Sequence, residues 1–247
     1  MKKSILVAAL ALMSTTAAAH TMWFKPSVFN LPKEERAQFV DVDIALGEHP
    51  FEIERALKPD AVKLIDAKNT VHTLEVTALN SLKSNVLVEL QHEGTHKLVA
   101  EFGPTVRKPK PGTKSKRPPT RTFTRLVSFL TVGAPTASTE VAANYLDVKA
   151  LTPPADIVAE EAFELQFFNQ GKAASQLEVT FVKEGGAYLD QPQSWTFTTD
   201  EAGKLSVTLD DAGRYWVKAG VSEELENDAE AKFLRSSLGL ALEVQVN

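Results

Sequence analysis

The sequence predicts an all-β protein, in which two antiparallel β-sandwich modules (Ig-like or prealbumin-like) follow a secretory signal peptide. Three observations lead to this fold class. Apolar and polar residues alternate along many short segments, as they do in half-buried strands. Turn sequences separate these segments, and sustained helical periodicity is absent. The chain of 247 residues has no cysteine, so an exported protein of this kind must be stabilised by its apolar core without disulfides.

Residues 1–19 have the three regions of a signal peptide in order. Lys2 and Lys3 form a positively charged start, an apolar run follows at 5–13, and Ala17 and Ala19 form an A-x-A cleavage site. The apolar run is too short to span a bilayer as a helix, which argues against an uncleaved membrane anchor. We therefore expect an exported periplasmic protein whose mature chain begins at residue 20.

The first module is expected over residues 20–140. Period-two alternation predicts its strands at 39–46, 70–79, 86–90, 96–102 and 123–129. Between the last two strands, residues 104–121 are rich in proline, lysine and arginine. This composition predicts a mobile loop inside the module, with no strand structure.

The second module is expected over residues 141–247, with a linker-like Thr152-Pro153-Pro154 near its start. Its strands are predicted at 163–167, 177–181, 195–197, 205–209, 215–219 and 238–246. One segment, Ser222–Ser236, is strongly acidic and is the only part of the chain that could be helical.

Charge is unevenly distributed in an acidic chain. The sequence has 27 basic and 32 acidic residues and a formal net charge of −5, which argues against nucleic-acid binding. The loop at 104–121 nevertheless holds seven basic residues and no acidic one. It is expected either to contact an anionic membrane surface or acidic partner, or to be a solvated insertion. The partner-binding residues predicted within it are Arg107, Lys108, Lys110, Lys114, Lys116 and Arg117.

No catalytic motif stands out. The sequence has no Gly-x-Ser-x-Gly elbow, no His-Glu-x-x-His pair, no phosphate-binding glycine loop and no EF-hand loop. The absence of cysteine also excludes thiolate metal sites and cysteine nucleophiles. We therefore expect a protein that is not an enzyme.

Short motifs in both halves point to a known family. They are His20–Pro26, Gly47–Phe51 and the Gly94-Thr95 turn in the first half, and Thr199–Leu205, Leu209 and Ala212–Val217 in the second. The second half resembles carboxypeptidase-regulatory or transthyretin-like modules. The whole mature chain is similar to a bacterial periplasmic family of unknown function that includes extracytoplasmic components of nickel and cobalt uptake systems. The chain departs from the family pattern at Thr21, where an acidic residue is common, and at His96, where a tyrosine is usual.

His20 is the first candidate metal ligand. If the signal peptide is cleaved after Ala19, this residue carries a free α-amine as well as an imidazole, and the two nitrogens can chelate Ni, Co or Cu. His49 is the best second imidazole, because it lies in a family-like segment just after the first strong strand. The alternative is that the terminus is frayed and binds nothing.

The other histidines are weaker candidates. His72 has the parity of Leu74 and is expected to point inward, as a structural group or as a further ligand. His92 is expected at a turn and exposed to solvent, and His96 is expected to be a satisfied core or corner histidine. The predicted metal set is therefore His20, His49, His72 and His92.

The resemblance and the ligand chemistry together predict a periplasmic protein that binds or delivers one divalent transition metal ion. Its partner would be a membrane transporter or an outer-membrane receptor. The alternative is an envelope adaptor without metal, which binds another envelope protein or a polymer through sheet edges or the basic loop.

Overall fold

A computed structural model of the protein describes residues 21–108, 118–136 and 141–247. In these ranges the chain is all-β, as predicted, and its only helical elements are two 3-10 turns, η1 (Pro154–Asp156) and η2 (Gly186–Tyr188). No helix within them is long and apolar enough to cross a membrane. The predicted signal peptide lies outside the described residues.

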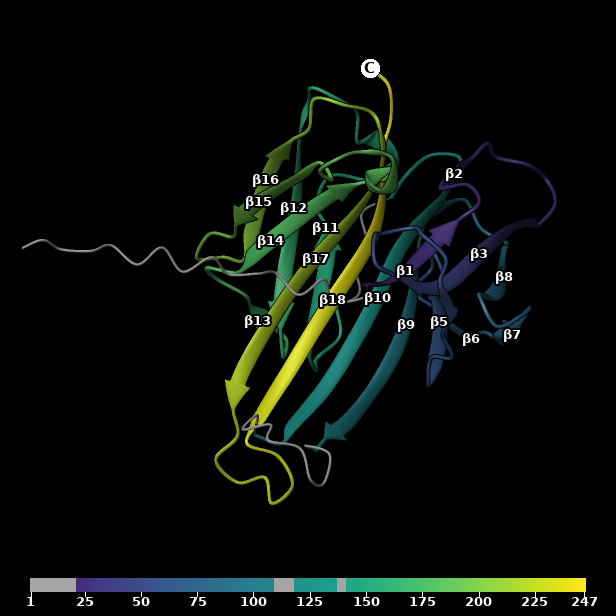
Figure 1. Cartoon of the computed structure of the whole chain (residues 1–247). Helices are drawn as coiled ribbons and strands as arrows, with labels where there is room; N and C mark the ends of the chain where they lie inside the picture. The colour runs from purple at the N-terminus through teal and green to yellow at the C-terminus, as the bar shows by residue number, and fades with distance from the viewer. Residues whose placement is uncertain (1–20, 109–117, 137–140) are drawn as a thin grey trace, which may run out of the picture.

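Three sheets make up the fold (Figure 1). A five-stranded sheet contains β1 (Thr21–Pro26), β3 (Gln38–Gly47), β4 (Arg55–Ala56), β7 (Thr77–Ala78) and β8 (Ser84–Leu90). A four-stranded sheet contains β11 (Leu146–Ala150), β12 (Ala162–Asn169), β13 (Lys172–Ala173) and β16 (Lys204–Thr208). Both pack on a larger central sheet.

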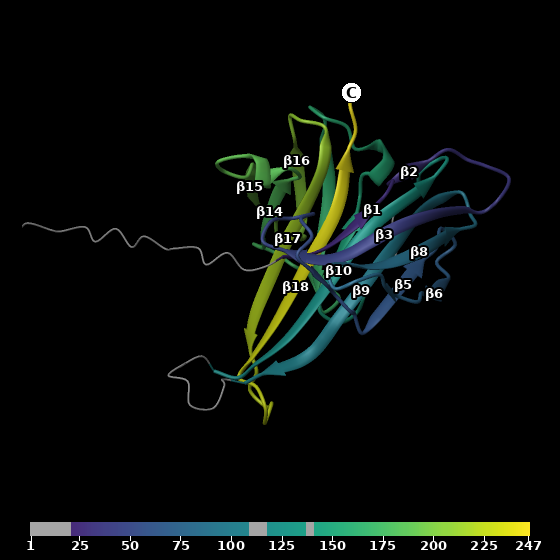
Figure 2. The ribbon, with the colours of Figure 1, turned by 45° about the vertical axis from the view of Figure 1, so that its right-hand side comes forward.

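The central sheet has nine strands, eight of them in the order β15-β14-β17-β18-β10-β9-β5-β6, with β2 pairing with β10. These strands are β2 (Asn30–Leu31), β5 (Ala61–Ile65), β6 (Val71–Thr73), β9 (Gly94–Arg107), β10 (Thr120–Val132), β14 (Glu178–Lys183), β15 (Ser194–Thr198), β17 (Gly213–Glu224) and β18 (Phe233–Val244). Figure 2 shows β1 and β3 lying across one face of this sheet.

Each face of the central sheet covers a separate apolar core. On β10, Leu126 and Leu130 pack into the core beneath the five-stranded sheet, whereas Val127 and Phe129 pack into the core beneath the four-stranded sheet. This division follows from the period-two geometry of a strand, which sends successive side chains to opposite faces. The two sandwiches therefore share their middle layer.

The pairing of β10 with β18 joins the two halves of the chain. It is parallel and runs from Thr120 opposite Phe233 to Ser128 opposite Ala241. The sheets are antiparallel elsewhere, as predicted, and the parallel pairings of named strands lie at this seam and at β2, which also runs parallel to β10. Strands from both sides of residue 140 thus belong to one hydrogen-bonded sheet.

Two segments differ from their sequence-based expectation. Residues 104–107 and 120–121 are strand, because β9 continues to Arg107 and pairs there with Thr120 of β10. Pro104 is accommodated because it lies beside a register shift between Thr122 and Thr124, where the regular ladder is interrupted. Residues 109–117 lie outside the described ranges.

The acidic segment 222–236 is not helical. It continues β17 to Glu224, forms a loop, and enters β18 at Phe233. Antiparallel hairpin pairing with β18, from Ser222 opposite Arg235 to Glu224 opposite Phe233, stabilises strand structure at both ends of the segment.

Candidate histidine pocket

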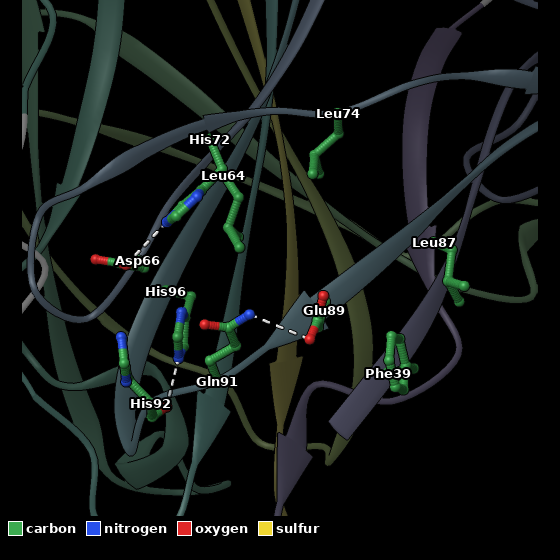
Figure 3. Close-up of a pocket in the computed structure, with 10 residues that line it drawn as sticks. All are labelled: Phe39, Leu64, Asp66, His72, Leu74, Leu87, Glu89, Gln91, His92 and His96. Carbon is green, nitrogen blue, oxygen red and sulfur yellow. Dashed lines mark hydrogen bonds and ion pairs between the residues drawn. The ribbon is translucent and has the colours of Figure 1, made fainter. Parts of the chain in front are cut away.

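A cavity of about 320 Å³ lies at the β6 end of the central sheet and is lined by three of the five histidines in the chain. His72, His92 and His96 contribute together with Asp66 (Figure 3). In the figure these four side chains gather on one side of the cavity, and the apolar side chains of Phe39 and Leu87 lie on the other.

Two turns bring the histidines together. Asp66 begins the turn between β5 and β6, and His92 lies in the turn before β9. Gly94 has a φ of +119°, and a Cβ at this position would lie 2.8 Å from the Cβ of Ala67. Because only glycine fits both the conformation and the space, Gly94 allows the two turns to approach closely.

Asp66 organises its turn and orients His72. Its Oδ1 accepts hydrogen bonds from the backbone N–H groups of Lys68 (2.9 Å) and Thr70 (2.8 Å). Its Oδ2 lies 2.9 Å from Nε2 of His72. Burial raises the pKa of Asp66, but the bonds from His72, Thr70 and Lys68 outweigh burial and lower it to about 2. Asp66 is therefore a carboxylate at every physiological pH.

His72 lies on the core-facing side of its strand, directly opposite buried Leu64, but its side chain is 47 % exposed. The parity predicted from the sequence is therefore confirmed, and of its two alternatives the buried structural group does not hold. β6 is the terminal strand of the central sheet, so a side chain on its inner face is only partly covered.

His96 is only 1 % exposed, as expected for a core or corner histidine. Its Nε2 donates a 2.7 Å hydrogen bond to the backbone carbonyl oxygen of His92. Because a carbonyl oxygen can only accept, the proton is on Nε2 and Nδ1 carries a lone pair. Nδ1 is buried and has no hydrogen-bond partner, so the expectation that this ring is fully satisfied is wrong.

The protonation state of His96 favours this lone pair. Burial lowers the pKa of His96, and the hydrogen bond to His92 opposes this effect only in part. The ring is therefore neutral at neutral pH. A buried neutral imidazole with one nitrogen fixed and the other free is a suitable ligand for a metal ion or an acceptor for a proton donor.

The other predicted metal ligands lie elsewhere. His20 is outside the described residues. His49 follows the far end of β3, so β3 separates it from the Phe39 side of the pocket by roughly 25 Å at the usual rise per strand residue. Within the described ranges, no three His, Asp or Glu side chains already surround a common metal position.

The turn that contains His49 does meet the start of the described chain. Thr21 pairs with Gly47 in the β1–β3 ladder, two residues before His49. In the same turn, Glu52 Oε1 is buried and has no hydrogen-bond partner in the structure. This neighbourhood is distinct from the histidine pocket.

The predicted partner-binding residues are only partly described. Arg107 ends β9, and Lys108 Nζ lies 3.8 Å from Glu230. Arg121, from the same basic segment, pairs with Asp228 at 2.7 Å. Lys110, Lys114, Lys116 and Arg117 lie outside the described residues. Within the described part of this segment, Lys108 and Arg121 therefore face the acidic loop of the chain itself.

Sequence reasoning missed Asp66 and the ligand character of His96. The pattern Asp66-Ala67-Lys68-Asn69-Thr70 before a strand is typical of a turn in which an aspartate accepts backbone hydrogen bonds, and this signal could have identified it. The free nitrogen of His96 depends on the position of the His92 carbonyl and has no sequence signal.

Comparisons with known proteins identify a family without assigning an activity. The family profile described as "Domain of unknown function (DUF4198)" matches residues 17–223. No curated protein matches the sequence significantly.

Similar solved structures are distant. The D0-D1 domain of intimin is 14% identical, with 92% of this chain and 100% of that chain covered and a TM-score of 0.26. A DUF4785 family protein from Legionella pneumophila is 13% identical, with 79% and 50% covered and a TM-score of 0.28. Trypsin-activated alpha-2-macroglobulin from Escherichia coli is 11% identical, with 90% and 16% covered and a TM-score of 0.26. At these values the likeness carries no argument about function.

Proposed function

This chain belongs to the family described as domain of unknown function (DUF4198), and we propose that it is an exported protein that binds one transition metal ion, Ni, Co or Cu, in the histidine pocket. The ligands are His72, His92 and His96. Asp66 does not bind the ion but orients His72 through its hydrogen bond to His72 Nε2. The proposal is one of binding and delivery, without a catalytic step.

One observation carries the proposal: two imidazoles in a single cavity have their Nε2 atoms occupied by oxygen acceptors. His72 uses Asp66 Oδ2 at 2.9 Å, and His96 uses the His92 carbonyl at 2.7 Å. Each ring thereby leaves Nδ1 for another contact. Metal-bound histidines typically have this arrangement, in which the second ring nitrogen donates to a carboxylate or carbonyl that fixes the tautomer and ring orientation.

The chemistry of the donors fits the proposed ions. Neutral imidazole nitrogen is a good ligand for Ni, Co and Cu. The ring of His92 forms no hydrogen bond within the described part of the chain, so it is free to rotate towards the other two. This rotation reconciles the proposal with the absence of a preassembled three-ligand group in the described residues.

The alternative position for the same metal ion is at the N-terminus. The ladder places Thr21 opposite Gly47, so the chain enters the sheet beside the turn that holds His49. The buried, unpartnered Glu52 Oε1 in that turn is an oxygen that a cation would satisfy. His20, once freed by signal cleavage, would add its amine and imidazole there.

Export to the periplasm and delivery to a membrane transporter or outer-membrane receptor complete the proposal. They are supported by the sequence of residues 1–19, with its lysines, apolar run and A-x-A site. The resemblance to components of nickel and cobalt uptake systems supports the role in delivery.

The test uses the mature protein beginning at His20, titrated calorimetrically with Ni²⁺, Co²⁺ or Cu²⁺. We expect one equivalent of at least one of these ions to bind. The single variants His72→Ala and His92→Ala are each expected to weaken binding at least tenfold. His49→Ala is the matched control, because it removes an imidazole outside the pocket. Loss of binding in His49→Ala alone would move the site to the N-terminus, and no stoichiometric binding would contradict the metal function.

The adaptor function remains the second candidate, and exposed apolar side chains favour it. Phe39 and Leu87 are 57 % and 60 % exposed on neighbouring strands of the five-stranded sheet. Such side chains support docking of another envelope protein. Cross-linking in cells with the wild type and with Phe39→Ser/Leu87→Ser tests this. If the wild type and the double variant capture the same partner equally well in the absence of metal, docking through this patch is contradicted.

A further inference from the structure

A second cavity, of about 450 Å³, lies on the central sheet where β1 begins, away from the histidine pocket. Its floor is a grid of cross-strand neighbours. Leu126, Gly239, Lys218 and Thr180 form one row across β10, β18, β17 and β14, and Thr124, Ser237 and Gly220 form the next. Gly220 and Gly239 leave the middle of this floor without side chains, and we call the resulting depression the glycine trough.

A buried hydrogen-bond donor lies at one end of the glycine trough. Trp216 is 7 % exposed, and its indole Nε1 has no hydrogen-bond partner in the structure. A Cβ at Gly239 would lie 3.0 Å from this nitrogen, so the glycine makes room for the indole N–H at the floor. An indole N–H can only donate, and leaving it unpaired and buried is destabilising. The trough therefore favours a ligand that brings an acceptor.

The charged side chains that line the glycine trough also favour a ligand with an anionic acceptor. Lys218 and Arg235 line it, both are exposed, and neither forms an ion pair within the described ranges. Lys218 Nζ lies 6.0 Å from the centre of the Trp216 ring. Among the described residues that line the trough, only Glu178 is acidic.

Hydroxyl groups and an apolar wall complete the lining. Thr124 and Ser237 add donors from the floor, and Met22 and Leu126 add apolar surface beside Trp216. Donors and positive charge next to an apolar wall match a ligand with an anionic oxygen group and an apolar body. We propose that the glycine trough binds a small organic carboxylate, whose oxygens accept from Trp216 and face Lys218 and Arg235. This site does not depend on metal binding.

The indole resonance of Trp216 gives a direct readout. The chain has three tryptophans, and Trp23 serves as an internal control because its Nε1 already donates to the Glu52 carbonyl at 3.2 Å. In ¹⁵N-labelled mature protein, benzoate is expected to shift the Trp216 indole signal saturably and to leave the Trp23 signal unchanged. Benzyl alcohol has the same ring without the carboxylate and is expected to have no effect.

A larger side chain at Gly220 fills the trough and gives a variant that tests the site. A Cβ at Gly220 would make only ordinary contacts, at 3.7 Å to the Ser236 oxygen and 3.9 Å to Ser237 Oγ. Gly220→Val therefore fits the strand and fills the trough, and it is expected to weaken benzoate binding at least tenfold, whereas Gly220→Ala changes it less. Lys218→Met, which leaves the floor intact, is expected to weaken binding as well.

Three results would overturn the proposal. One is the absence of a Trp216 indole shift at about 20 mM benzoate, a concentration in the range of dissociation constants of weak carboxylate sites. Another is an equal shift with benzyl alcohol. The third is unchanged benzoate affinity in both Gly220→Val and Lys218→Met.

Discussion

Single ring nitrogens determine what the histidine pocket can bind. His96 holds its Nε2 proton towards the His92 carbonyl, and the lone pair on Nδ1 is left in a place that water does not reach. A buried acceptor without a partner is destabilising on its own. The destabilisation is removed only if a ligand binds this Nδ1 lone pair. His96 is therefore the most informative residue of the pocket.

Replacing His96 separates binding from folding. His96→Leu removes the free nitrogen and keeps an apolar side chain of moderate size in the core. We expect metal affinity to fall at least tenfold and the free energy of unfolding to change by only about 1 kcal/mol. Calorimetric titration and urea unfolding measure the two effects. Unchanged metal affinity in a folded variant would exclude His96 as a ligand.

Asp66 gives the pocket a defined pH dependence. Its pKa is lowered from 3.8 to about 2 in the folded protein, so the carboxylate stabilises the fold at any pH above the unfolded value. This contribution is lost as the pH falls towards 2. We expect Asp66→Asn to lower the free energy of unfolding by roughly 2 kcal/mol at pH 7, and the difference from the wild type to shrink between pH 4 and pH 2.

Urea unfolding at pH 7, 4 and 2.5 checks this expectation. A wild-type advantage of equal size at all three pH values would show that the Asp66 carboxylate is not the source of the stability.

At the level of elements, the contact between two turns positions the pocket. Gly94→Ala places a Cβ 2.8 Å from the Cβ of Ala67, and the alanine must adopt the φ of +119° that this position has, which is unfavourable for any residue with a Cβ. We expect a loss of about 2–4 kcal/mol and weaker metal binding, because the His92 turn must move away. Gly185→Ala is the control, since Gly185 also has a positive φ, +96°, but nothing lies within 4 Å of its Cβ. Equal losses in the two variants would show that the turn-to-turn contact is unimportant.

A buried ion pair between Lys97 and Asp147 connects β9 to β11. Lys97 Nζ lies 2.9 Å from Asp147 Oδ1 and donates to the Val148 carbonyl at 2.9 Å, and the side chains are only 4 % and 3 % exposed. Lys97→Met leaves the Asp147 charge buried and is expected to cost about 3–5 kcal/mol in thermal or urea unfolding. Lys183→Met breaks the more exposed pair with Asp211 and is expected to cost less than about 1 kcal/mol. Similar costs would contradict the role assigned to burial.

The shared central sheet governs the behaviour of the whole molecule. β10 of the first half and β18 of the second half pair over nine residue positions, and both cores use side chains from the same strands. We therefore expect one cooperative unfolding transition by fluorescence and by circular dichroism. Residues 20–140 and 141–247, expressed separately, are expected not to fold. Two separate transitions, or two folded halves, would contradict a shared sheet.

Local patterns in the sequence predicted the elements better than their assembly. Alternation along 39–46 and 238–246 placed β3 and β18, because one buried face is enough to produce a period of two. The parallel seam between β10 and β18 has no local signal, since it depends on residues more than a hundred positions apart. The same is true of the pocket: His92 was recognised at its turn, but its meeting with Asp66 depends on the packing of Gly94 against Ala67.

The most direct test of the metal proposal is a crystal structure of the mature protein soaked in Ni²⁺, Co²⁺ or Cu²⁺, with anomalous data collected at the absorption edge of the ion. We predict an anomalous peak in the pocket, about 2.1 Å from Nδ1 of His96 and of His72. The His72 and His96 Nε2 atoms should retain their bonds to Asp66 and to the His92 carbonyl. A peak beside His49 alone, or no ordered peak in a fully loaded crystal, would contradict the claim that the histidine pocket is the metal site.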